Sequence, residues 1–280
     1  MSSSGYEPDR DISRAQPRDP AMPQLARVSD ARLGDVGRLF TSDLSVSDFA
    51  LLRSVDVQPL ELVMGTSVYH IGWQGGQYNA NQELGVLTAA MYNARDYAIR
   101  RMEEEAAFSG ADGVVGVKLG YRTHGEPHHI EFLAYGTAIR WNREPGALRL
   151  PNGRPFTSDL SVPDFVTLLG TGHVPVAFVL GNCVYHVSTS SLRQMFRQAG
   201  RNIEIPQWTQ GHYTARELAM TRLHDEAEAY GATGIVGMDV TVSEWVWGFH
   251  TLEFFATGTG IKPFPTGVEP RLPQVIVPTR

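Results

Sequence analysis

The ten residues FTSDLSVSDF, at positions 40–49, occur again as FTSDLSVPDF at positions 156–165, with one difference, Ser47 against Pro163. The correspondence continues at a constant offset of 116 residues and includes the triplet Val-Tyr-His at positions 68–70 and 184–186. Self-similarity at a fixed spacing is the sequence signature of a repeated unit. The chain therefore contains two copies of one unit.

Two further blocks repeat in the same order. The segment GADGVVG at 110–116 matches GATGIVG at 231–237, and HHIEFLAYGTAI at 128–139 matches HTLEFFATGTGI at 250–261. The offset grows to 121 and then to 122, so only small insertions separate the blocks. A whole domain is duplicated.

These blocks predict five segments along the chain. The two domains occupy residues 39–140 and 156–262. Residues 1–38 are rich in Ser, Pro, Arg and Asp, which predicts a disordered segment. Residues 141–155 contain three prolines and two glycines, typical of a short, stiff linker, and residues 263–280 form a proline-rich tail.

Each unit is predicted to be α+β, opening with a short helix. Ser45 with Asp48, and Ser161 with Asp164, have the spacing at which an N-cap side chain and the third helical residue satisfy free amides at the helix start. The same signal in both copies predicts the same short helix twice.

A strand and one long helix follow in each unit. The predicted strands, 60–71 and 176–187, are interrupted by Gly65 and Gly181, which indicates a bulge or a close approach of another backbone. Apolar residues three and four apart predict the long helices, and we expect the second to begin near Gln207. Two β-rich segments close each unit as a hairpin, at 114–121 with 128–139 and at 235–242 with 247–261.

The chain resembles the YbjQ-like family, whose label is heavy-metal binding. The resemblance is carried by ARDYAIRRMEEEA (94–106), GADGVVGV (110–117) and GTAI (136–139), and by their counterparts in the second copy. It implies dodecin-like subunits that assemble into rings, typically five-fold. Duplication puts a five-chain, single-layer ring in doubt, and leaves open ten domains in two layers or a mixed ring.

Composition excludes several classes of partner. The net charge is −6, so there is no electrostatic footprint for nucleic acid or anionic membrane. No apolar stretch is long enough to span a bilayer, and the first 20 residues lack the apolar core of a signal peptide. We expect a cytoplasmic homo-oligomer.

Metal binding is the chemistry that the family label suggests, and histidines and glutamates paired by the repeat are the candidate ligands. The alternative, which we favour, is that these residues hydrogen-bond each other or the backbone across a subunit interface. Within one strand, residues i and i+3 point to opposite faces, so one copy cannot gather a complete site. A site would form between subunits, and the single cysteine argues against soft metals. No cofactor is firmly implied beyond a divalent metal ion. The predicted ligands are His70, His128, Glu131, His186, His250 and Glu253.

An aromatic stripe distinguishes the second copy. Trp245, Trp247 and Phe249 alternate, so they line one face of the closing hairpin. They are either core residues or an interaction surface for a protein partner, since aromatic side chains anchor interfaces.

No catalytic constellation repeats in both copies, so we expect a protein that is not an enzyme. Two functions remain open. One is a ring-forming, oligomeric binding or scaffold protein. The other is a metal-binding protein whose site lies between subunits.

Overall fold

The computed structural model describes residues 41–71, 80–124, 129–188, 204–244, 247–248 and 250–268. The first unit contains α2 (Val46–Arg53), β1 (Val57–His70), β2 (Gln82–Glu83), α3 (Gly85–Phe108), β3 (Gly113–His124) and β4 (His129–Trp141). The second contains β5 (Phe156–Thr157), α4 (Val162–Gly170), β6 (His173–His186), α6 (Pro206–Ala229), β7 (Gly234–Glu244) and β8 (Thr251–Pro263). The predicted α+β architecture is confirmed.

The short helices begin where the capping signals predict. The Ser45 hydroxyl accepts the amide hydrogen of Asp48 at 3.1 Å, and the Asp48 carboxylate accepts the Ser45 amide at 3.2 Å. At α4 the Ser161 hydroxyl accepts the Asp164 amide at 3.3 Å. These bonds satisfy amides that have no acceptor inside the helix.

Each long helix lies directly on a glycine of its own sheet. A Cβ atom on Gly65 would lie 2.0 Å from the Ala98 carbonyl oxygen of α3, and one on Gly181 would lie 2.1 Å from that of Ala219 in α6. Of the two predictions for these glycines, the close backbone approach is therefore confirmed, while the strands shift register elsewhere, next to Pro59 and Pro175. Helix α6 begins one residue before the predicted start at Gln207.

The two units exchange short strands. The sheet orders are β1-β4-β3-β5 and β2-β6-β8-β7. The two-residue strand β5 of the second unit pairs in parallel with β3, and β2 of the first unit pairs antiparallel with β6. Each sheet thus has three strands from one unit and a fourth from the other.

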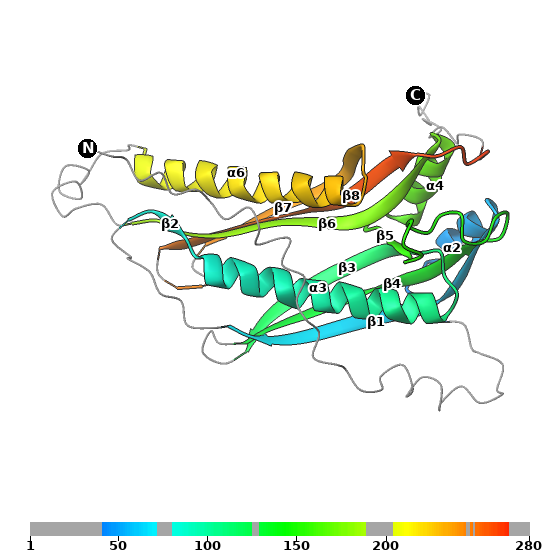
Figure 1. Cartoon of the computed structure of the whole chain (residues 1–280), viewed down its shortest axis with the longest axis horizontal. Helices are drawn as coiled ribbons and strands as arrows, with labels where there is room; N and C mark the ends of the chain where they lie inside the picture. Colours follow the sequence, from blue (N-terminus) through cyan, green and yellow to red (C-terminus); the bar gives the residue numbers. More distant parts are fainter. Residues whose placement is uncertain are drawn as a thin grey trace, which may run out of the picture.

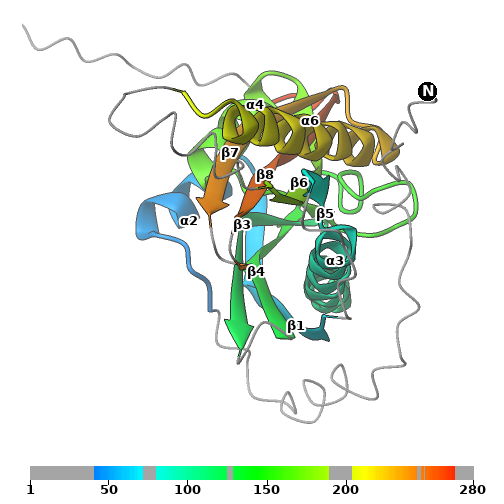
Figure 2. The same cartoon turned by 90° about the vertical axis from the view of Figure 1, so that its left-hand side faces the viewer.

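The two long helices differ in what surrounds them. Helix α6 covers one face of the second sheet, whereas α3 lies between its own sheet and the opposite face of the second sheet (Figures 1 and 2). The core around α3 accordingly includes Phe178 and Val184 of β6. Among the described residues no helix is both long and apolar enough to cross a membrane.

The connection between the units is packed. The buried Asp112 carboxylate accepts the amide of Trp141 at 2.8 Å and that of Gly146 at 2.7 Å. Leu148 and Leu150 are buried, and Leu148 belongs to a core that α2 and α4 share. The segment therefore holds the two units together as well as joining them.

Candidate functional site

A buried polar network crosses the interface between the units, and it contains an ion pair. Arg95 of α3 makes two parallel bonds to Glu226 of α6, at 2.7 and 2.8 Å. The same carboxylate accepts the backbone amide of Leu180 in β6 at 3.1 Å. A two-pronged guanidinium–carboxylate contact fixes orientation as well as distance.

A second buried ion pair involves the exchanged strand. Arg222 of α6 donates to both oxygens of Glu83 in β2, at 2.7 and 3.0 Å, and to the Asn182 carbonyl at 2.9 Å. Both side chains are almost completely buried. Removing either partner would leave the other charge buried without a counter-charge, which is strongly destabilising. The pair therefore stabilises the position of β2 in the sheet of the second unit.

Two hydroxyl groups of α3 accept backbone amide hydrogens along the edge of β6 that does not pair with β8. Tyr92 accepts the Asn182 amide at 2.7 Å, and Thr88 accepts the Val184 amide at 3.2 Å. Burial raises the pKa of Tyr92, so the hydroxyl stays protonated. The first unit thus supplies acceptors for a strand edge that would otherwise be open to pairing with another chain.

Glu253, a predicted metal ligand, is the centre of a third contact. One of its oxygens accepts the Tyr121 hydroxyl at 2.6 Å and the Trp247 indole N–H at 3.0 Å, and the other accepts the Asn182 amide group at 3.4 Å. Burial raises the pKa of Glu253, and the three donors oppose that rise. The carboxylate therefore links β3 of the first unit to β8 of the second, a role that competes with metal binding.

Trp247 belongs to the core of this interface. Its indole is buried and stacks on the Tyr121 ring, with centroids 6.3 Å apart and planes at 12°. Of the two interpretations of the aromatic stripe, the position of Trp247 fits the core. Trp245 and Phe249 lie outside the described residues, as does His128.

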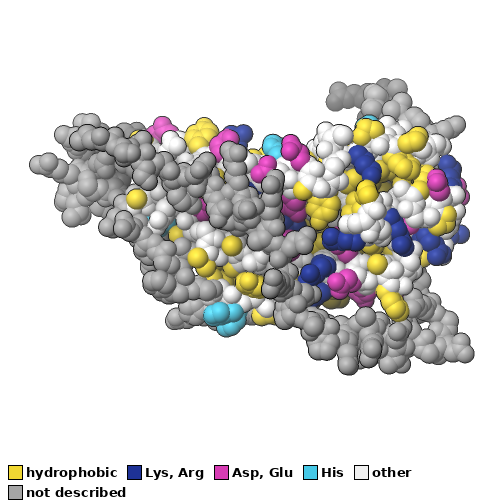
Figure 3. Space-filling model, viewed as in Figure 1, with side chains coloured by type: hydrophobic (Ala, Val, Ile, Leu, Met, Phe, Trp, Pro, Cys, Tyr) yellow, Lys and Arg dark blue, Asp and Glu magenta, His cyan; other side chains and the backbone are white. Residues whose placement is uncertain are grey.

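Among the described residues the predicted metal set is not brought together, and the histidine that lies beside His70 is His129, which is outside that set. His70 faces His129 across β1 and β4, with ring centroids 5.1 Å apart, and both side chains are exposed. Figure 3 shows a patch of histidine side chains at the lower left of the face in view. The corresponding His186 is buried and faces Thr251. The described residues contain no group of three or more His, Cys, Asp or Glu that could hold a metal.

The other predicted ligands lie apart. His250 has a backbone φ of 60° and its ring lies 6.2 Å from that of Trp208 on α6. Glu131 lies on β4 opposite Val68. Metal binding between subunits stays a prediction.

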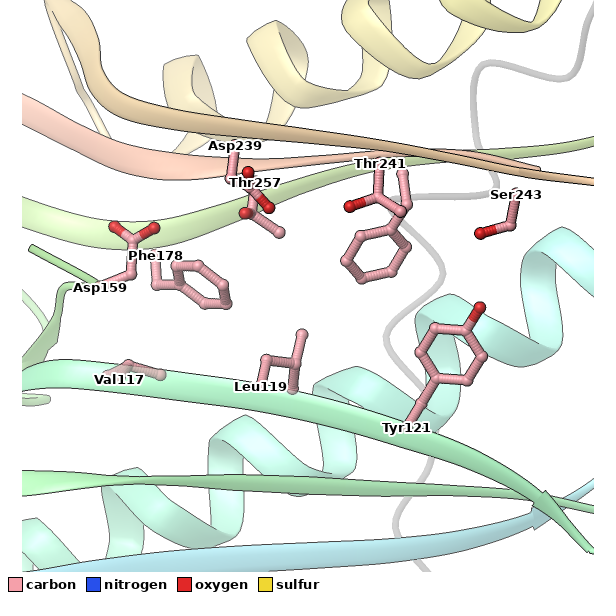
Figure 4. A pocket seen from close by; sticks show the side chains of 10 residues that line it. Val117, Leu119, Tyr121, Asp159, Phe178, Asp239, Thr241, Ser243 and Thr257 are labelled. Carbon is pink, nitrogen blue, oxygen red and sulfur yellow. The ribbon is translucent and has the colours of Figure 1, made fainter.

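A cavity of about 500 Å³ lies between β3 and the second sheet. Figure 4 shows Leu119 and Phe178 within it, with Asp159 near one end and Tyr121 and Ser243 near the other. Burial raises the pKa of Asp159, and the nearby Asp239 carboxylate adds to that rise. The two carboxylates favour a cationic over an anionic occupant.

The sequence carries a signal for this interface that lies outside the three repeated blocks described above. The long helices start 121 residues apart and have equal length, so their residues correspond one to one. The polar residues described above that α3, α6 and the short strand β2 contribute to this interface each have a counterpart of the same type in the other unit. The pairs are Glu83 and Glu204, Thr88 and Thr209, Tyr92 and Tyr213, Arg95 and Arg216, Arg101 and Arg222, and Glu105 and Glu226.

A family model described as "Putative heavy-metal-binding" (YbjQ_1) matches residues 62–142 and, a second time, residues 171–263. The chain belongs to the YbjQ family. The double match confirms the tandem duplication that the sequence repeat predicted.

Relatives of two lengths match this YbjQ chain. The encapsulin nanocompartment protein Rv1762c of Mycobacterium tuberculosis is 52% identical over 255 residues, which cover 91% of this chain and 97% of the relative. A UPF0145 protein of Halorubrum lacusprofundi is 42% identical over 89 residues, 30% of this chain but 85% of that protein. A UPF0145 protein of Pseudothermotoga lettingae is 35% identical over 89 residues, 83% of its length. The two UPF0145 proteins therefore correspond to a single unit.

Proposed function

We propose that this chain is a non-enzymatic building block that assembles with itself into a closed ring and works in association with an encapsulin compartment. One observation carries the proposal of self-assembly. Apolar side chains that are buried between the two units have counterparts, elsewhere on the chain, that are exposed.

The first exposed surface lies on the first unit, along β1. Met64 and Val68 are 48% and 66% exposed. Their counterparts in β6, Leu180 and Val184, are both fully buried, and Val184 belongs to the core around α3 of the first unit. The first sheet thus exposes apolar side chains at the positions whose counterparts are buried in the second sheet.

The second exposed surface lies on the second unit. Tyr213 of α6 is 58% exposed, whereas its counterpart Tyr92 is buried against β6. Three exposed residues of β7 extend this surface, and their counterparts in β3 lie against the second unit. They are Met238, Val240 and Val242, matching Val117, Leu119 and Tyr121.

These two surfaces are complementary halves of one interface, and each half lies on a different unit of the chain. A contact between different surfaces leaves each new copy with the same two surfaces, so it continues until a ring closes or a filament forms. A ring buries every such surface. The single-unit length of the UPF0145 relatives also supports an interface that works between separate chains.

The association with an encapsulin compartment rests on the relative from Mycobacterium tuberculosis. That protein is named an encapsulin nanocompartment protein and matches this chain over nearly the whole length of both. We infer that the present chain, as an assembled ring, accompanies an encapsulin shell.

Native mass spectrometry of the untagged protein tests the self-assembly. We expect a single species at a whole-number multiple of 30.9 kDa. Val68→Gln should shift it towards single chains, whereas Phe108→Gln should not, because Phe108 is also exposed but corresponds to the exposed Ala229. A wild-type protein that is a single chain at micromolar concentration would overturn the proposal.

Co-expression with the encapsulin shell protein of the same genome tests the association. We expect the chain to co-elute with shell particles on size exclusion and to be protected from added protease inside or against the shell. Separate elution and full protease sensitivity would remove the encapsulin part of the proposal and leave self-assembly intact.

Metal binding is a second proposal, favoured by the adjacent imidazoles of His70 and His129. Two imidazoles on facing strands suit a divalent ion such as Zn²⁺, with further ligands from a neighbouring chain. In titration calorimetry with Zn²⁺, His129→Ala should abolish the binding. His173→Ala, a half-buried histidine whose ring Nδ1 lies 3.1 Å from the Thr171 carbonyl oxygen, is the control. Wild-type protein that binds no Zn²⁺ would exclude it.

A further inference from the structure

The polar contacts between the units specify how a second chain would dock. This inference rests on the self-assembly proposed above. We propose that the first unit of a second copy binds α6 of the first copy in the register that the two units already have within one chain. Two ion pairs would then form between chains, Arg216 with Glu105 and Glu204 with Arg101.

The first pair reproduces that of Arg95 with Glu226. Arg216 occupies the position of Arg95 on its helix and is exposed. Glu105 corresponds to Glu226 and makes the same preparatory contact, because it accepts the Met64 amide at 2.7 Å as Glu226 accepts that of Leu180. The carboxylate is therefore already held where an incoming guanidinium would meet it.

The second pair reproduces that of Glu83 with Arg222. In this pair the second unit supplies the glutamate, whereas in the first pair it supplies the arginine. Arg101 corresponds to Arg222, and it donates to the Thr66 carbonyl as Arg222 donates to that of Asn182. Glu204 corresponds to Glu83 and is exposed just before α6. One positive and one negative group on each surface thus face their opposites.

Uncharged contacts agree with the same register. Tyr92 and Thr88 accept the amides of Asn182 and Val184 within the chain. Between chains, the corresponding hydroxyls of Tyr213 and Thr209 in one copy would accept the amide hydrogens of Thr66 and Val68 in the docked copy. Four side chains of the second unit would therefore find their partners along β1 and α3 of the next chain.

This register also decides which ring is allowed. Within one chain the two units are already neighbours, so each chain adds two successive units. A closed single-layer ring that repeats this contact therefore holds an even number of units. The five-unit ring that the resemblance implies for single-unit proteins is excluded for this chain.

Charge reversal tests the register. Arg216→Glu alone and Glu105→Arg alone should each place like charges together and shift native mass spectra from the ring to single chains. The combination of both changes in one chain should restore the ring, because the pair re-forms with exchanged signs. Glu104→Arg, on the same helix but 66% exposed and 3.9 Å from the Arg100 guanidinium, is the matched control and should leave the ring intact.

Each outcome has one meaning. Loss of assembly in both single variants with rescue in the double variant supports the register. An assembled wild type that tolerates both single reversals, or a double variant that stays dissociated while its circular dichroism matches the wild type, overturns the register but leaves the proposed self-assembly standing. A wild type that never assembles overturns both.

Discussion

Helices α3 and α6 occupy the same place in the repeat and have the same length, yet they are buried to different extents. Of their 24 residues, 13 are buried in α3 and six in α6. The difference arises because α3 has a sheet on both sides and α6 on only one (Figure 2). Equivalent sequences therefore lie in two environments, one covered on both sides within the chain and one exposed on one side.

The largest test of this comparison is the loss of a buried ion pair. Arg95→Ala should lower the free energy of unfolding by about 3–5 kcal/mol, because Glu226 would stay buried without its partner. Arg216→Ala, at the same place in α6, should change the stability of the single chain by less than about 0.5 kcal/mol. Urea denaturation of dilute protein measures both. Equal effects would show that the two helices are not in different environments.

Substitution of the strand glycines should affect both units alike. Gly65→Ala and Gly181→Ala should each cost about 2–3 kcal/mol, because the added Cβ would overlap a helix carbonyl and push the helix off its sheet. Thermal unfolding with the two variants side by side measures this. Gly120→Ala, where a Cβ atom has open space, is the control. A large loss in only one unit would mean that the helices pack differently on their sheets.

The two tyrosines at equivalent helix positions should respond differently to loss of the hydroxyl. Tyr92→Phe should lower the free energy of unfolding by about 1–2 kcal/mol, because the Asn182 amide loses its acceptor in a buried position. Tyr213→Phe should leave the single chain unchanged and weaken only the ring. Denaturation midpoints and native mass spectra of the two variants separate these effects.

The smallest effect is a change in pH dependence. Burial raises the pKa of Glu103 in α3 from 4.5 to about 7, against the opposing pull of Arg154, whereas α6 has the exposed His224 at this position. The folded protein therefore binds a proton more tightly than the unfolded chain between these values, so stability from this group is present below pH 4.5 and is lost as the pH rises to 7. Glu103→Gln should flatten that decline in urea denaturation series. An unchanged slope would contradict the raised pKa.

Much of the architecture could be predicted from local signals. Ser45 and Ser161 fix the helix starts because capping depends on neighbouring residues alone, and the identical placement of Gly65 and Gly181 indicated a close approach that the structure confirms. The repeat itself predicted two equivalent units.

The contacts between the units could not be predicted from those local signals. Strands of two residues, such as β2 and β5, are too short to show a period, so nothing in the pattern says that they join the other unit's sheet. Glu253 was predicted as a metal ligand because it pairs with Glu131 in the repeat. Two of its three hydrogen-bond donors, Tyr121 and Asn182, come from distant positions, and Tyr121 belongs to the other unit.

The exchanged strands also bear on how the protein is made. During synthesis the first unit leaves the ribosome before Phe156 and Thr157, so its sheet lacks β5 until the second unit begins to emerge. Gln82 and Glu83 must wait longer, because β6 ends at His186 and Arg222 follows later still. Neither four-stranded sheet can therefore be completed before residues of the second unit have emerged. The nascent chain should therefore acquire its protease resistance late and in a single step.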